Sequence, residues 1–426
     1  MNRAERRRQL KATRGPTSKR EATLALAAQQ LGNSQPERAY QALTRLLSAD
    51  ENDLDALHFA GVAKYQLGDY DVAMGYLDRA IELAPTYAEA HNSLGILHLE
   101  AGRADLAAEC FRQAVAHRPD YANAYTNLGN ALRQGDELEE AVDAYLHALT
   151  RDPAATQPAY RLAATLISLG RADDALGAIE ACLSIDPWCQ NALASKGIAL
   201  QMTGAIDEAQ ALHDFTHLVQ PVEIEPPAEY SSIQAFNDVL ARAVHANPSL
   251  TWEPLNRVTR HGAVTQDMLI KPIKPVRQFE QTLRNAIDRY RDQLVADPEH
   301  PFLNRIPERY RLTFIASILR EGGWHPSHIH ESAWLSGVYY VDVPPAVTGR
   351  AIADDGAREG TAEDGGWLEF GRPDYQLPEG VEPFTEKFPP VSGLARFFPS
   401  YFFHGTIPFA GGGERIGIAF DVYPDV

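Results

Sequence analysis

The stretch "AEAHNSLGILHLEAGRADLAAECFRQAVAHRP", residues 88–119, has the pattern of two amphipathic helices separated by Gly102. Its small residues and its closing proline recur every 34 residues through the first half of the chain. The recurring positions are Pro85, Pro119, Pro153, Pro187 and Pro221, then Ala39, Ala73, Ala107, Ala141, Ala175 and Ala209, and finally Gly61, Gly95, Gly129 and Gly197 with Ala163 in the missing slot. Three residue types that share one period indicate a structural repeat.

Each repeat is predicted to be a helix–turn–helix unit. Its small residues let the two helices approach closely, and bulky residues such as Leu94 and Phe111 fill the space between them. The proline ends the second helix because it has no N–H to donate. One unit cannot bury its own apolar face, so about six units are expected to stack into a solenoid over residues 20–223. Residues 1–19 are strongly basic and are predicted to form a disordered tail.

This pattern resembles the tetratricopeptide repeat family. The family positions fall on Leu94, Gly95, Ala107, Phe111, Ala114 and Pro119. The resemblance implies an all-α solenoid whose groove binds a protein or peptide partner, and it implies no chemistry.

Composition narrows the possible partners and the compartment. The 426 residues carry a net charge of −18, which disfavours nucleic acid as a partner because phosphates would be repelled. No apolar run is long enough to span a membrane. Three cysteines at unpatterned spacings suit a reducing, cytoplasmic location.

The pattern changes after Pro221. The stretch "PVEIEPPAEY", residues 221–230, is predicted to be a stiff link, and helical patterns follow over residues 231–246 and 275–296. From residue 311 onward, short β-branched and aromatic runs alternate with turn residues, which predicts an antiparallel β sandwich or barrel. The fold class is therefore multidomain α + β, with a second domain over residues 224–426. The stretch "AGGGER", residues 410–415, is predicted to be a hairpin turn.

Histidines mark a candidate metal site in this second domain. In "HIHESAWLSGVYY", residues 328–340, His328 and His330 point to the same side if the segment is a strand. His404 lies on another predicted strand, and three neutral imidazoles can occupy one face of a metal ion while leaving the other face open. A hairpin after His404 would return Arg415 to the same cavity, where a guanidinium can bind a carboxylate through two hydrogen bonds.

Two stretches, residues 322–344 and 393–424, resemble the 2-oxoglutarate- and Fe(II)-dependent oxygenases. The resemblance implies a double-stranded β-helix (jelly-roll) fold with flanking helices, bound Fe(II), and 2-oxoglutarate and O2 as cosubstrates. It also implies hydroxylation of a protein or peptide that the repeats recruit, with no catalytic side chain beyond the metal centre. Carried over by position, the metal ligands are His328, His330 and His404. The cosubstrate residues carried over are Arg415 and Tyr340, with Ser336 and Arg396 as weaker candidates, and His325 is a candidate neighbour of the metal or substrate.

One position departs from the family pattern of His-x-Asp/Glu…His. His330 occupies the carboxylate slot, and Glu331 is the alternative ligand if the strand is bulged there. Two other functions stay open: a cupin-like three-histidine metal enzyme that does not use 2-oxoglutarate, and a non-catalytic repeat adaptor with an inactive barrel. A fragment that begins near Pro226 is expected to keep its iron and to lose activity on the recruited substrate.

Overall fold

The computed structural model describes residues 19–253, 259–347 and 364–425, and the chain divides into two compact units at residues 165 and 166. Helical repeats followed by an antiparallel β domain confirm the predicted fold class. The basic tail, apart from Lys19, lies outside the described residues. Within the described part of the chain, no helix is both long enough and apolar enough to cross a membrane.

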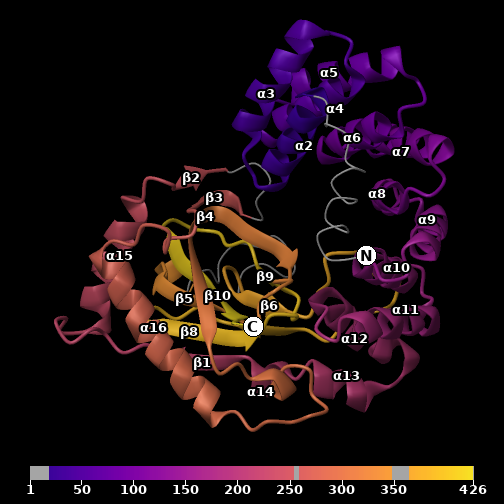
Figure 1. The fold of residues 1–426 in the computed structure, drawn as a ribbon. Helices are drawn as coiled ribbons and strands as arrows, with labels where there is room; N and C mark the ends of the chain where they lie inside the picture. The colour runs from indigo at the N-terminus through magenta and orange to yellow at the C-terminus, as the bar shows by residue number, and fades with distance from the viewer. Residues whose placement is uncertain (1–18, 254–258, 348–363, 426) are drawn as a thin grey trace, which may run out of the picture. The chain divides into compact units, whose positions relative to one another are not determined.

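The first unit consists of successive helix pairs (Figure 1). Its helices are α2 (Lys19–Gly32), α3 (Pro36–Ala49), α4 (Leu54–Gln66), α5 (Tyr70–Leu83), α6 (Ala88–Glu100), α7 (Ala104–His117), α8 (Ala122–Gln134), α9 (Leu138–Arg151) and α10 (Thr156–Ser168), and the division between the units falls within α10. Helices α5, α7 and α9 each end two residues before a proline of the 34-residue series, as the repeat predicts.

The recurring glycines are required by close helix contacts. A Cβ atom added to Gly95 would lie 2.6 Å from the Phe111 ring, and one added to Gly129 would lie 2.6 Å from the Tyr145 ring. Phe111 and Tyr145 are fully buried. The glycine on the first helix of each pair therefore makes room for the aromatic side chain on the second, which explains why both positions share the period.

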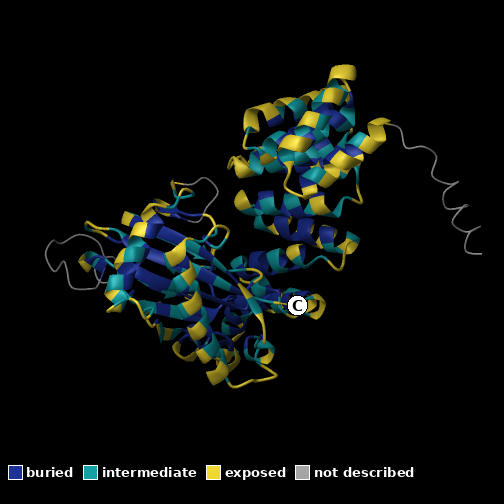
Figure 2. Ribbon diagram, turned by 60° about the vertical axis from the view of Figure 1, so that its left-hand side comes forward, coloured by how far each residue is buried: buried dark blue, intermediate teal, exposed yellow. Residues whose placement is uncertain are grey.

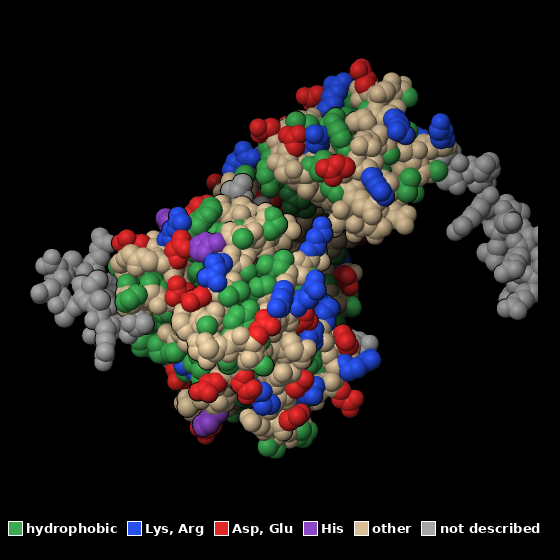
Figure 3. All heavy atoms as spheres, turned by 90° about the vertical axis from the view of Figure 1, so that its left-hand side faces the viewer, with side chains coloured by type: hydrophobic (Ala, Val, Ile, Leu, Met, Phe, Trp, Pro, Cys, Tyr) green, Lys and Arg blue, Asp and Glu red, His purple; other side chains and the backbone are tan. Residues whose placement is uncertain are grey.

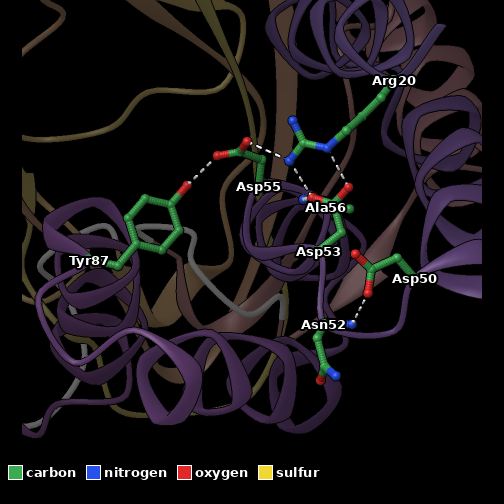
Figure 4. A network of polar contacts seen from close by, with 7 residues as sticks. All are labelled: Arg20, Asp50, Asn52, Asp53, Asp55, Ala56 and Tyr87. Carbon is green, nitrogen blue, oxygen red and sulfur yellow. Dashed lines mark hydrogen bonds and ion pairs between the residues drawn. The ribbon is translucent and has the colours of Figure 1, made fainter. Parts of the chain in front are cut away.

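An ion-pair network joins α2 to the start of α4 in the first unit (Figure 4). The Arg20 guanidinium donates to both carboxylate oxygens of Asp53 at 2.6 Å and to Asp55 at 2.7 Å. Asp53 is the N-cap of α4 and accepts from the backbone N–H of Ala56. The Tyr87 hydroxyl donates to Asp55, so the network links α2, α4 and the turn before α6.

We expect Arg20→Ala to destabilise the α2–α4 end of the first unit by about 1 kcal/mol, the upper range for a partly exposed pair. The hydrogen bonds from Arg20 hold the pKa of Asp53 below its ordinary value. A lowered pKa stabilises the fold above the unfolded pKa of Asp, about 4, and this stabilisation is lost as the pH falls. Hydrogen exchange of α2–α4 should thus rise in the variant at pH 7, and its difference from the wild type should shrink as the pH falls through the lowered pKa of Asp53. Equal exchange at pH 7 would contradict this role.

The last repeat helices belong to the second unit. These helices are α11 (Ala172–Ile185), α12 (Gln190–Thr203), α13 (Ile206–Leu212) and α14 (Phe215–Leu218). Strand β1 (Gln220–Glu223) follows directly and pairs with β8 (Leu394–Pro399). The prediction that residues 221–230 form a stiff link is therefore wrong in its first part, because Pro221–Glu223 form the edge of the sheet.

Two antiparallel sheets form the β domain, and one strand belongs to both. The strands after β1 are β2 (Thr251–Trp252), β3 (Arg260–Val264), β4 (Tyr310–His328), β5 (Leu335–Asp342), β6 (Leu368–Phe370), β7 (Glu386–Phe388), β8, β9 (His404–Thr406) and β10 (Arg415–Pro424), and the short 3-10 turns are η1 (Leu303–Arg305) and η2 (Pro345–Val347). The order is β1-β8-β5-β10-β4-β9-β6-β7, with β3 also against β4 and β2 against β3. The long β4 carries the chain from the larger sheet into the smaller one.

Helices α15 (Ile233–His245) and α16 (Lys274–Gln293) cover the outer face of the larger sheet (Figure 1). Along β10 the even-numbered residues Ile416 to Val422 enter the core with these helices, while Arg415, Ala419 and Asp421 line the inner cavity. The strands are accordingly buried and the outer helix faces exposed (Figure 2). Acidic and basic side chains are interspersed with apolar ones over this side of the unit (Figure 3).

The segment between β6 and β7 lies against the repeat helices of the second unit. Gln201 of α12 binds its backbone twice, donating to the Glu382 carbonyl at 2.6 Å and accepting from the Phe384 N–H at 3.1 Å. Ser168 donates to the Gln376 carbonyl at 2.6 Å. The repeats of this unit therefore already hold an extended segment of their own chain.

Candidate metal centre and carboxylate pocket

Three imidazoles meet where β4 passes into the smaller sheet. His328 is the last residue of β4 and pairs in register with His404 on β9. His330 follows two residues later, and its backbone N–H donates to the Ser400 carbonyl at 3.1 Å. One potential ligand nitrogen from each histidine lies within 4.8 Å of the others.

Hydrogen bonds define which ring nitrogen carries the proton. The Nδ1 atoms of His328 and His404 lie 2.8 and 2.9 Å from the backbone carbonyl two residues earlier in the chain. The Nδ1 atom of His330 lies 2.8 and 2.9 Å from the two carboxylate oxygens of Asp421. Because carbonyl and carboxylate oxygens only accept, each Nδ1 donates, and each neutral ring leaves Nε2 unprotonated.

The Nε2 atoms of His330 and His404 are 3.3 Å apart, so they can share a hydrogen bond only if one of the two rings carries a second proton. Burial lowers the pKa of His328 to about 4 and holds the pKa of His404 well below its ordinary value, so these rings are neutral at physiological pH. A divalent metal ion would satisfy all three nitrogens, and the donor set fits Fe(II), which imidazole binds well.

The imidazoles lie at the wall of a cavity of about 140 Å³ between the two sheets. Apolar walls come from Ile315, Val338, Leu368 and Phe398. Polar lining comes from Thr259, Thr313, Ser317, His325, Thr406, Arg415 and Asp421. The cavity therefore combines three convergent imidazoles, apolar and polar side chains, and one guanidinium.

Arg415 is a buried cation with no anionic partner among the described residues. Its side chain is 2% exposed, its Nε atom has no hydrogen-bond partner in that same set, and its guanidinium lies 4.9 Å from the ring centroid of Tyr340. The Tyr340 hydroxyl is also buried and unpaired there. Burial lowers the pKa of Arg415 and raises that of Tyr340. A buried charge without a partner is costly, so the pair fits a carboxylate ligand.

The predicted hairpin before Arg415 is wrong. Strand β9 pairs with β4 and β6, whereas β10 pairs with β4 and β5, so the residues between them connect the two sheets. Arg415 reaches the cavity because β10 continues beside β4, with Arg415 opposite Leu319.

The remaining candidates lie around this centre in different ways. Ser336 donates to Asp421 at 2.6 Å and does not line the cavity. Glu331 is exposed and accepts from Asn191 at 3.0 Å, so the structure does not bring it to the imidazoles. Arg396 stacks over the Phe388 ring with its Nε unpaired. His325 lines the cavity beside Thr406, with Nδ1 3.2 Å from its hydroxyl.

The residue that sequence reasoning missed is Asp421. Its carboxylate contacts His330 and also lines the cavity. A signal was present in the sequence, because Asp421 lies six residues after Arg415 on one predicted strand, and an even offset places both side chains on the same face.

Family comparisons agree with this architecture. Residues 315–421 match the family model described as "Putative 2OG-Fe(II) oxygenase". Residues 92–156 match the "Tetratricopeptide repeat" model, and residues 61–102 match the "TPR repeat" model. A comparison with curated proteins gives no match.

Several solved structures are similar to part of this chain. "Crystal structure of MamA protein" is 28% identical with a TM-score of 0.36, covering 38% of this chain and 88% of that chain. "MamA 41-end from Desulfovibrio magneticus RS-1" is 24% identical with a TM-score of 0.36, covering 41% and 97%. A third, titled "Crystal structure of YrrB: a TPR protein with an unusual peptide-binding site", is 18% identical with a TM-score of 0.38, covering 41% and 90%.

Proposed function

Because the chain joins tetratricopeptide repeats to a domain of the 2OG-Fe(II) oxygenase family, we propose that it is an Fe(II)- and 2-oxoglutarate-dependent dioxygenase. Its substrate is a protein or peptide that the repeats recruit, and the product carries a new hydroxyl group. The observation that carries the proposal is one cavity with three convergent imidazoles and an unpaired buried arginine.

Each residue has a defined task in this proposal. The Nε2 atoms of His328, His330 and His404 hold the metal. Arg415 and Tyr340 bind the distal carboxylate of 2-oxoglutarate, which supplies the anion that the buried guanidinium lacks. When bound, Fe(II) with 2-oxoglutarate and O2 supplies the oxidant for a substrate C–H bond. The apolar walls exclude water from that reaction.

We place the binding surface for the recruited protein or peptide on the repeats of the first unit. Repeats of this family bind other proteins or peptides, and stacked repeats together form a continuous surface. In the second unit, the segment between β6 and β7 already occupies Gln201 and Ser168. A recruited chain would therefore use the remaining repeats, and joining recruitment to the oxygenase makes substrate capture intramolecular.

The test of this function is succinate release by the iron-loaded full chain, with cell lysate or candidate peptides as substrate. Succinate that depends on 2-oxoglutarate and O2, together with a mass increase of one oxygen in a peptide, supports the proposal. Metal-dependent oxidation that proceeds without 2-oxoglutarate would instead support the three-histidine alternative, which the all-imidazole donor set favours. If the full chain binds no metal, the result would instead support the non-catalytic repeat adaptor with an inactive barrel.

We expect Arg415→Ala to weaken 2-oxoglutarate binding while metal binding is kept. Truncating one partner of a buried charged pair costs about 2–5 kcal/mol, which corresponds to roughly 30- to several thousand-fold in Kd. Calorimetric titration of the metal-loaded protein measures the change. Arg396→Ala is the matched control, because Arg396 is a neighbouring unpaired arginine that does not line the cavity. Weaker binding in Arg396→Ala alone would move the carboxylate site to that residue.

A further inference from the structure

We propose that Asp421 is a positioning residue that supplies, through His330, the negative charge that a carboxylate ligand contributes in the His-x-Asp/Glu…His pattern. This inference rests on the proposed metal site. It assigns a role to a side chain that has no place in the motif from His328 to His404.

The first support is the contact itself. Both carboxylate oxygens of Asp421 lie within 2.9 Å of His330 Nδ1, and the two side chains are 14% and 21% exposed. The other two rings donate to neutral backbone carbonyls. His330, the residue in the carboxylate slot, is thus the ring among the three that has an anionic partner.

The second support is how firmly Asp421 is held. The Ser336 hydroxyl donates to one carboxylate oxygen at 2.6 Å, and the Tyr423 hydroxyl donates to the other at 3.3 Å. Ser336 is itself 2.8 Å from the Ser400 hydroxyl. Since Ser400 also accepts from the His330 backbone, one network fixes both the ring and its carboxylate.

The third support is the charge of the cavity. Among the described lining residues, Asp421 is the one carboxylate, and Arg415 adds a positive charge to the same space. Before 2-oxoglutarate binds, a divalent ion held by the three imidazoles would otherwise share the cavity with that guanidinium and no lining carboxylate. A carboxylate behind the ring raises the basicity of Nε2 and fixes its orientation, which strengthens the metal bond.

The experiment is a calorimetric titration of the metal-free full chain with Fe(II) without oxygen, repeated with Co(II). Asp421→Asn is nearly isosteric and removes the charge, and we expect it to weaken both metals about 10- to 100-fold. The control Asp342→Asn removes an exposed carboxylate at the end of the neighbouring strand β5 and should match the wild type. Ser336→Ala and Tyr423→Phe keep the charge and should each lose less affinity than Asp421→Asn.

A second readout separates a charge role from a folding role. In the double variant H330D/D421N, the carboxylate moves into the ligand position, and we expect it to bind Co(II) more tightly than H330D alone, in which two buried carboxylates compete. The visible Co(II) spectrum should change in D421N and not in D342N. Equal metal affinity of D421N and the wild type, or no advantage of the double variant over H330D, overturns the inference while the metal site stands. Absence of metal binding by the wild type overturns the proposed function itself.

Discussion

A chain that begins at Pro226 is expected to lose its folded β domain and its metal site, although it keeps every proposed ligand. The deleted part contains β1 and buried apolar side chains of the second-unit core, namely Leu193, Leu212, Phe215, Leu218 and Val219. Burying each such side chain stabilises the fold by about 1.5–3 kcal/mol. Their sum is of the same order as the whole stability of a domain, about 5–15 kcal/mol. Circular dichroism and calorimetric metal titration measure the loss.

The matched control is a chain that begins at Thr156, which keeps α10 whole together with all of the second unit. This chain should fold and bind one metal ion as the full chain does. Sequence alone predicts instead that a fragment starting near Pro226 keeps its iron. Full metal affinity in that fragment would support the sequence-based prediction and show that the last repeats do not support the β domain.

The second large effect is expected for His404→Ala, which should abolish stoichiometric metal binding. His404 lies opposite His328 in the strand register, and its Nε2 is 3.3 Å from that of His330, so it completes the donor set. Losing a direct ligand should exceed the roughly 10- to 100-fold loss that is typical when a supporting hydrogen bond is removed. Metal content by atomic absorption after dialysis, with calorimetry, gives the result.

Two variants serve as controls for this prediction. His325→Ala removes a histidine that lines the same cavity and lies outside the convergent set, so metal content should remain near one ion per chain. Glu331→Gln should likewise keep the metal, because Glu331 is exposed and bonded to Asn191. Metal loss in E331Q with retention in His330→Ala would transfer the third ligand position to Glu331.

Sequence alone determined the features that depend on local pattern. The 34-residue period predicts that Gly95 packs against Phe111 and that α7 ends two residues before Pro119. Both features depend only on residues within one repeat. The two-residue spacing of His328 and His330 likewise predicts that their rings share a side, and both rings join the convergent set. These inferences use residues close together in the chain, where spacing largely fixes direction, and His330 joins His328 although β4 ends at His328.

Only the tertiary structure determined which residues far apart in the sequence are in contact. Asp421 meets His330 across 91 residues of sequence, and Tyr401 donates to the Leu212 carbonyl across 189. No period or motif encodes such pairs, because they depend on strand order and on the register in which β4 joins the two sheets. For the same reason, the repeat pattern runs on to residue 223, whereas the compact unit that carries the candidate metal site begins at residue 166. The repeats define a continuous helical pattern, and burial against the β domain decides which of them share its core.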